Sequence, residues 1–198
     1  MTRILLTGFE PFAGNKVNPT ERIVEVFEGR HELVTHVLPV EFDGARTQLK
    51  TVLAQTKPDA VLALGLDAHS EQVKLERVAL NLADSTKPDN AGAQPVDKPL
   101  EAGGPAARFS SFEWRRILEQ LHSVEIPAAA SLSAGTYVCN AVLYTLLEYT
   151  ESHPHAVGGF MHVPPLERIN LDTQVRATEI ALYELDRTIH AAHTNKPA

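Results

Sequence analysis

Three short apolar runs, each lying between segments with helical periodicity, stand out in the hydrophobic pattern of the chain. They cover residues 4–7, 60–64 and 157–163. Continuous apolar runs of this length are typical of strands buried on both faces of a parallel sheet. We therefore expect an α/β fold: a single domain over 1–198, with a mostly parallel twisted sheet flanked by helices on both faces.

Polar and charged positions mark the helices around these strands. Asn18 is a suitable N-cap, Pro19 suits the first helical position, and Glu21 lies three residues after the cap. A second helix is expected over about 43–57 and a long C-terminal helix over about 172–193. The helices thus alternate with the strands, as an α/β fold requires.

The segment between residues 84 and 107 has neither pattern. It contains several helix- and strand-breaking residues, namely Pro88, Gly92, Pro95, Pro99, Gly103, Gly104 and Pro105. Loops of this length inside a compact domain are usually functional. We interpret this one as a lid or a subunit-contact segment.

Charge and composition restrict the possible partners. A net charge of −7 and a pI near 5.7, with no cluster of Lys and Arg, argue against a nucleic-acid partner. The first apolar run is too short for a signal peptide, and no run reaches the roughly 18 residues of a membrane span. We therefore expect a soluble, cytoplasmic protein whose partner is not a membrane.

The single cysteine, Cys139, is a candidate nucleophile. Small and turn-forming residues over 133–138 lead into it, and the apolar segment 141–148 after it is helical in pattern. At the start of a helix, backbone N–H groups and the helix dipole stabilise a thiolate. The alternative is an inert cysteine buried as a small apolar side chain.

A thiolate nucleophile needs a neighbouring base, and the chain has nine histidines. His162 lies at the end of a buried strand and is followed by Pro164 and Pro165. Functional groups of open α/β sheets gather at the carboxyl ends of strands, so position favours His162 over the others. No His, Cys and carboxylate spacing predicts a metal site.

Glu76 lies in segment 73–81, which alternates like a strand but changes face at its centre. This change predicts a strand with a bend. Taken alone, Glu76 beside Arg77 is interpreted more simply as a surface charge pair.

Four segments of the chain together resemble the pyroglutamyl-peptidase I family. They are residues 7–14 with Asn18 and Pro19, residues 76–81 with Asp84 and 88–90, residues 133–140, and residues 159–164. The resemblance implies a nucleophile, a general base and an orienting carboxylate, which are Cys139, His162 and Glu76 respectively. It also implies a substrate pocket formed by Phe9, Phe12, Asn18, Tyr137 and Val138.

The same resemblance implies the activity and the assembly. Peptides with an N-terminal pyroglutamate are the expected substrates, cleaved through an acyl-enzyme without a metal or an organic cofactor. A homotetramer is the expected assembly.

Three positions depart from the family pattern. Leu66 stands where the family usually has a glutamine, Thr86 where it has the arginine expected at the oxyanion hole, and Lys87 where it has an apolar pocket residue. Loss of one oxyanion donor costs about 2.7–4 kcal/mol of transition-state stabilisation. Either Thr86 faces the nucleophile and the charge is lost, or Lys87 supplies it.

These departures leave three functions open. The first is a cysteine hydrolase that removes an N-terminal pyroglutamyl residue. The second is a related cysteine amidase that accepts another small acyl group, and the third is a non-catalytic binding protein on the same scaffold.

Overall fold

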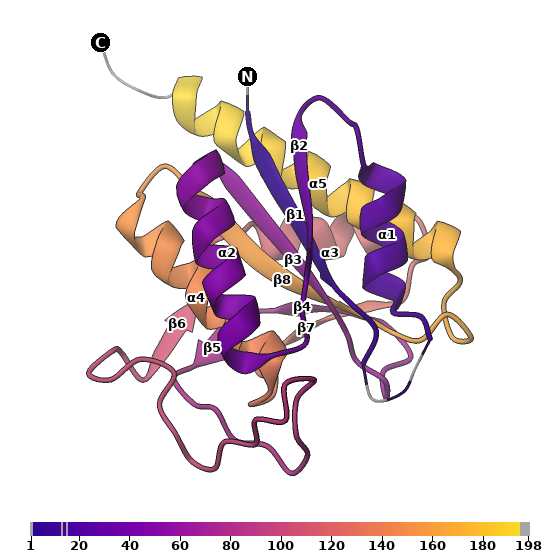
Figure 1. Ribbon diagram of the computed structural model, residues 1–198. Helices are drawn as coiled ribbons and strands as arrows, with labels where there is room; N and C mark the ends of the chain where they lie inside the picture. Colours follow the sequence, from indigo (N-terminus) through magenta and orange to yellow (C-terminus); the bar gives the residue numbers. More distant parts are fainter. Residues whose placement is uncertain (1, 13, 15, 195–198) are drawn as a thin grey trace.

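A six-stranded mixed sheet forms the centre of the protein in a computed structural model, which describes residues 2–12, 14 and 16–194, with side chains up to residue 191. Four strands are parallel and lie in the order β2-β1-β3-β8. They are β1 Ile4–Phe9, β2 Leu33–Leu38, β3 Ala60–Leu66 and β8 Val157–Val163. On the far side of β8 lie β4 Val73–Glu76, antiparallel to β8, and β7 Ala128–Ser131, parallel to β4 (Figure 1).

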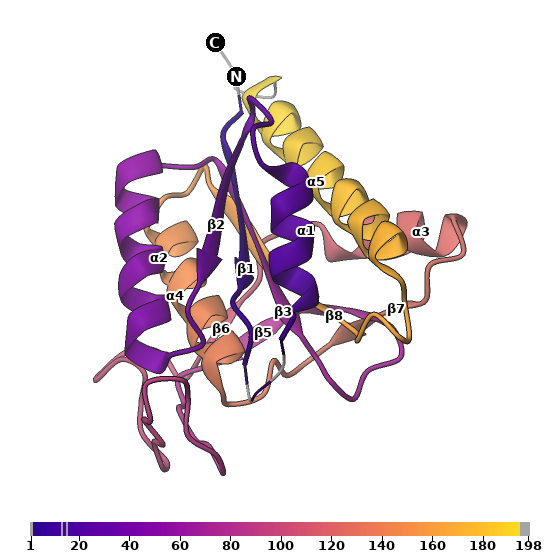
Figure 2. The ribbon, with the colours of Figure 1, turned by 45° about the vertical axis from the view of Figure 1, so that its right-hand side comes forward.

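Helices cover both faces of this sheet. One face carries α1 Pro19–Phe27, α3 Trp114–Ser123 and α5 Leu171–Thr194, and the other carries α2 Phe42–Thr56 and α4 Val138–Ser152 (Figure 2). Neighbouring residues of β1 point to opposite faces, since Leu6 packs in one core and Leu5 in the other. Because both faces of the sheet are buried, its strands appear in the sequence as continuous apolar runs. The expected α/β fold with a mostly parallel sheet is confirmed.

The expected helix boundaries agree closely with the structure. The side chain of Asn18 caps α1, its Oδ1 accepting a hydrogen bond of 3.0 Å from the N–H of Thr20, and Pro19 is the first helical residue. Helices α2 and α5 begin and end within one residue of the predicted ranges. Helix α3 was not predicted. Of the described helices, none has both the length and the apolar composition needed to cross a bilayer.

The predicted bend after Glu76 separates two sheets. Strand β5 Val78–Leu80 pairs with β6 Ala107–Phe109 in a small antiparallel sheet of its own. Between β4 and β5, the N–H of Arg77 donates to Ser131 O at 2.9 Å and its carbonyl accepts from Ser110 N at 2.9 Å. The chain therefore leaves the central sheet directly after Glu76.

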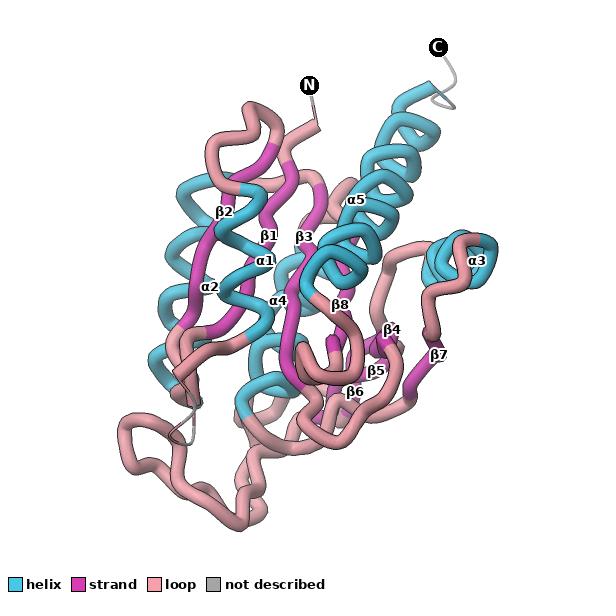
Figure 3. Tube along the Cα trace, turned by 90° about the vertical axis from the view of Figure 1, so that its right-hand side faces the viewer, coloured by secondary structure: helices cyan, strands magenta, loops and turns pink. Residues whose placement is uncertain are grey.

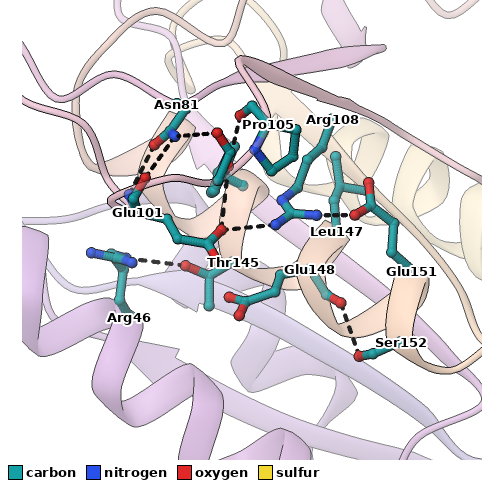
Figure 4. Close-up of polar contacts among 12 residues, drawn as sticks. Arg46, Asn81, Glu101, Pro105, Arg108, Thr145, Leu147, Glu148, Glu151 and Ser152 are labelled. Atoms are coloured by element: carbon teal, nitrogen blue, oxygen red, sulfur yellow. Dashed lines mark hydrogen bonds and ion pairs between the residues drawn. The ribbon is translucent and has the colours of Figure 1, made fainter.

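The segment from residue 84 to residue 106 is drawn without helix or strand below the sheet (Figure 3). Buried Arg108 holds the C-terminal end of this segment in place. Its guanidinium donates to Glu101 at 2.8 Å and to Glu151 (Figure 4). Asn81 adds a matched pair of bonds, donating to Glu101 O and accepting from Glu101 N, each at 2.8 Å. The end of the loop is therefore fixed to α4 and β5, while a role as lid or subunit contact stays a prediction.

Candidate active site

A cavity of about 470 Å³ opens at the carboxyl ends of β1, β3 and β8. Its wall includes residues from seven separated parts of the chain, and those that follow β1, β3 and β8 meet there because parallel strands end at one edge of a sheet. All eight of the site residues predicted from the sequence line it: Phe9, Phe12, Asn18, Glu76, Tyr137, Val138, Cys139 and His162.

Helix α4 holds Cys139 at its amino end. Val138 is the first helical residue and Cys139 the second, and no side chain caps the helix. Asn140, fully buried, accepts a hydrogen bond from Leu80 N and donates to Leu80 O and Leu82 O, each at 2.9 Å. This amide locks the start of α4 against β5. The sulfur therefore lies where first-turn N–H groups and the helix dipole favour negative charge.

A glycine on β3 makes room for the sulfur. A β-carbon at Gly65 would lie 2.9 Å from Cys139 Sγ and 2.6 Å from the ring of Phe160. Both separations are shorter than van der Waals contact. Any larger residue at position 65 would push Cys139 away from the end of the strand.

Glu76 and His162 form a buried pair. Nδ1 of His162 lies 2.8 Å from Oε1 of Glu76, and the two residues are 6% and 1% exposed. Among the described residues, Oε2 of Glu76 has no hydrogen-bond partner. The interpretation of Glu76 as a surface charge paired with Arg77 is wrong, since the Arg77 guanidinium stacks 4.4 Å over the ring of Trp114.

The electrostatics of this group favour a charged imidazole. Burial opposes the charge on His162, but hydrogen bonds with Cys139 and Glu76 outweigh it and raise the pKa of His162 to about 10. Because Glu76 occupies Nδ1, the second nitrogen, Nε2, is left for the thiol. A thiolate beside an imidazolium is a nucleophile able to attack a carbonyl carbon.

We expect Glu76→Gln to lower kcat by roughly 10- to 1,000-fold, less than removal of the nucleophile, because an orienting group assists without reacting. The carboxylate also favours the charged imidazolium, so its loss lowers the pKa of His162. The alkaline limb of the kcat/KM profile, which reports loss of the imidazolium proton, should therefore move to lower pH.

The pH profile distinguishes this role from a structural one, since a folding defect lowers activity without moving the limb. Glu179→Gln is a matched control, because Glu179 is a surface residue of α5 whose partner is Arg30 at 3.1 Å. Wild-type kinetics and an unmoved alkaline limb in Glu76→Gln would contradict the role of Glu76.

Aromatic side chains form the wall beside the sulfur. The rings of Phe12 and Tyr137 are 5.3 Å apart between centroids, and Tyr137 meets Phe42 edge-on at 5.2 Å. The Tyr137 hydroxyl donates to Pro88 O at 3.0 Å. Burial, with the nearby charge of Asp89, raises the pKa of Tyr137 to about 12, which keeps this hydroxyl a donor.

Asn18 lines the cavity, and two hydrogen bonds to the backbone hold its side chain in place. Its Oδ1 accepts from Thr20 N, and its Nδ2 donates to Glu10 O at 2.9 Å. The side chain is thereby held between the end of β1 and the start of α1. Asn18 thus shapes this part of the wall.

The three positions that depart from the family pattern do not all lie at the cavity. Leu66 and Lys87 line the cavity, whereas Thr86 is exposed and does not. The Lys87 ammonium lies 4.6 Å over the Phe12 ring. The expectation that Thr86 faces the nucleophile is therefore wrong, while the alternative that Lys87 supplies the charge of the arginine stays a prediction.

Sequence reasoning missed the residues that follow β3. Asp67 and His69 line the cavity, and Asp67 accepts a hydrogen bond of 2.7 Å from Lys74. Burial raises the pKa of Asp67, but the bond to Lys74 and the backbone bond from His69 together lower it below its usual value. Asp67 and His69 follow directly after a buried parallel strand, and this position in the sequence could have predicted them as site residues. Within the described part of the chain, no cluster of three or more His, Cys, Asp or Glu side chains is arranged to hold a metal.

Similar proteins match this chain along most of its length. A pyrrolidone-carboxylate peptidase of Thermococcus onnurineus is 38% identical over 194 residues, covering 91% of this chain and 96% of the relative. One from Clavibacter michiganensis is 40% identical over 168 residues, covering 83% and 79%.

Solved structures of similar proteins superpose on nearly the whole of this chain. Pyroglutamyl peptidase I of Bacillus amyloliquefaciens superposes with a TM-score of 0.90 at 34% identity, over 93% of this chain and 97% of that one. Pyrrolidone carboxyl peptidase of Thermococcus litoralis superposes with a TM-score of 0.91 at 33% identity, over 97% and 96%. The family model described as pyroglutamyl peptidase matches residues 2–194. The chain belongs to the pyroglutamyl peptidase family.

Proposed function

We propose that the protein hydrolyses the amide bond that follows an N-terminal pyroglutamyl residue of peptides, with Cys139 as nucleophile, His162 as general base and Glu76 as its orienting group. A single observation carries this proposal. The buried pair of His162 and Glu76, the sulfur at the start of α4 and the aromatic wall all line one cavity.

The reaction proceeds by acyl transfer. The Cys139 thiolate attacks the carbonyl carbon of the scissile bond, and the negative oxygen of the tetrahedral intermediate is stabilised by N–H groups at the start of α4. The imidazolium of His162 gives its proton to the leaving amine, and the C–N bond breaks. Neutral His162 then takes a proton from water, which attacks the thioester and releases pyroglutamate and the free thiolate.

The cavity suits a small, flat and neutral acyl group. A lactam ring offers one N–H and one C=O, and most of its surface is apolar. Phe9, Phe12 and Val138 present apolar surface close to Cys139. Such a pocket binds the ring by burial and leaves orientation to a few hydrogen bonds.

Hydrolysis of pyroglutamyl-aminomethylcoumarin by the purified protein tests the proposal. We expect turnover of this substrate and none of two comparison substrates. Prolyl-aminomethylcoumarin has a ring without the lactam carbonyl, and glutamyl-aminomethylcoumarin has an open, charged chain. Absence of turnover, with Cys139 still alkylated near neutral pH, would favour the cysteine amidase of other acyl specificity. That second function draws its support from Leu66 and Lys87 in the cavity wall.

We also infer a cytoplasmic location and a homotetramer, both supported by membership of the family. Light scattering on the purified protein measures the assembly directly. A mass other than four times 21.7 kDa would contradict the tetramer.

A further inference from the structure

Lys87 places a positive charge at the solvent end of the cavity. Its Nζ lies 4.6 Å from the ring centroid of Phe12 and 5.6 Å from that of Tyr137. Lys87 is exposed, whereas Val138 and His162 at the catalytic end are buried. An ammonium over two aromatic faces is held by its attraction to both rings.

The backbone on both sides of Lys87 is fixed. Ser85 Oγ donates to Lys87 O at 2.6 Å and accepts from Lys87 N at 3.2 Å, which closes a tight turn. On the other side, Tyr137 donates to Pro88 O, and buried Asp89 accepts at 2.8 Å from the first N–H of α2. The position of Lys87 at the cavity mouth is therefore set by the surrounding fold.

The charge of Lys87 is available to a ligand. No carboxylate of the described residues forms an ion pair with it. Asp67 also lines the cavity, but its carboxylate already pairs with the ammonium of Lys74 at 2.7 Å. The mouth consequently presents a cation whose counter-charge must come from solution or from a bound molecule.

We propose that Lys87 determines specificity by binding a carboxylate in the peptide portion of the substrate, so that peptides with an acidic residue directly after pyroglutamate are preferred. The inference rests on the proposed function. With the acyl group beside Cys139 at the buried end, the rest of the peptide leaves across the exposed rim of the cavity, where Lys87 is the one Lys or Arg among the described lining residues. An ammonium there attracts a carboxylate and leaves a neutral amide unaffected.

Two substrates that differ by one charge test this. Pyroglutamyl-glutamyl-alanine amide and pyroglutamyl-glutaminyl-alanine amide are nearly isosteric, and the ratio of their kcat/KM values isolates the charge. We expect the wild type to prefer the glutamyl peptide by roughly two- to fivefold, the usual strength of a solvent-exposed charge pair. The preference should disappear in Lys87→Met, remain in Lys87→Arg, and weaken at high salt.

Lys98→Met serves as the control, since Lys98 carries the same charge in the same loop and lies outside the cavity wall. It should keep both the activity and the ratio of the wild type. A ratio unaffected by Lys87→Met would overturn the proposal, and so would an equal loss of kcat on both peptides, which would place Lys87 at the oxyanion. If the wild type also fails to cleave pyroglutamyl-aminomethylcoumarin, the proposed function itself is refuted.

Discussion

Replacing Cys139 with alanine is expected to lower kcat/KM for pyroglutamyl substrates by at least about 10⁴-fold, because no other atom of the site can form the acyl-enzyme. The change removes one partly buried sulfur and fills no space, so the free energy of unfolding should change by no more than about 1 kcal/mol. Steady-state kinetics and urea unfolding of the same preparation measure the two effects separately.

Cys139→Ser provides the stricter comparison. Its hydroxyl keeps the size and the hydrogen bond of the side chain, but an alcohol is far less ionised than a thiol, so activity should be nearly as low as in Cys139→Ala. Because Cys139 is the only cysteine of the chain, iodoacetamide should modify one thiol in the wild type and none in either variant. Turnover by purified Cys139→Ala would rule out this nucleophile.

Replacing His162 should produce the second largest loss, visible both in turnover and in the reactivity of the sulfur. An ordinary thiol is only about 1% thiolate at pH 6.5, whereas an imidazolium neighbour keeps the thiolate populated. We therefore expect iodoacetamide to alkylate Cys139 roughly 10- to 100-fold more slowly near pH 6.5 in the variant. Turnover should fall by at least about 10³-fold.

The choice of variant affects this experiment, since His162→Ala leaves the buried carboxylate of Glu76 without its partner. His162→Gln retains a donor for Glu76 and separates loss of the base from loss of stability. Alkylation of Cys139 should depend more steeply on pH in both variants than in the wild type, because neither variant has an imidazolium beside the sulfur. His36→Gln, at a half-buried histidine outside the cavity wall that is bonded to Gln48, is the control. Identical pH profiles for wild type and variants would contradict the pairing.

The pKa of His162 also affects stability at high pH. A folded-state pKa of about 10, above the ordinary value of 6.5, means that the folded protein holds this proton more tightly than the unfolded chain. The contribution to stability is complete below pH 6.5 and is lost as the pH rises from 6.5 through about 10. The ion pair that prepares the nucleophile therefore ceases to stabilise the fold at alkaline pH.

Local chemistry in the sequence was enough to determine the fold class and most helix boundaries. Residues 4–6 and 60–64 are apolar without interruption because their strands are covered on both faces, and such a pattern arises in few other environments. The cap at Asn18 and the glycine- and proline-rich loop depend on backbone preferences of a few adjacent residues. These signals are local, so they can be recognised without tertiary contacts.

The position of Cys139 at a helix start and that of His162 near a strand end could also be predicted, because each follows from its own element. Their roles stay predictions, as do those of the pocket residues. What could not be predicted is the environment of Glu76. Its sequence neighbour Arg77 suggested a surface pair, whereas its hydrogen-bond partner is His162, which is 86 residues away.

Only the tertiary structure decided which residue of the loop faces the cavity. Thr86 and Lys87 are adjacent, and no periodicity in an irregular loop says which side chain points inward. The choice depends on the turn at Ser85, the bond from Tyr137 to Pro88 and the two aromatic rings, which come from distant parts of the chain. Long-range contacts of this kind set the orientation of a loop side chain, and a single sequence does not contain them in readable form.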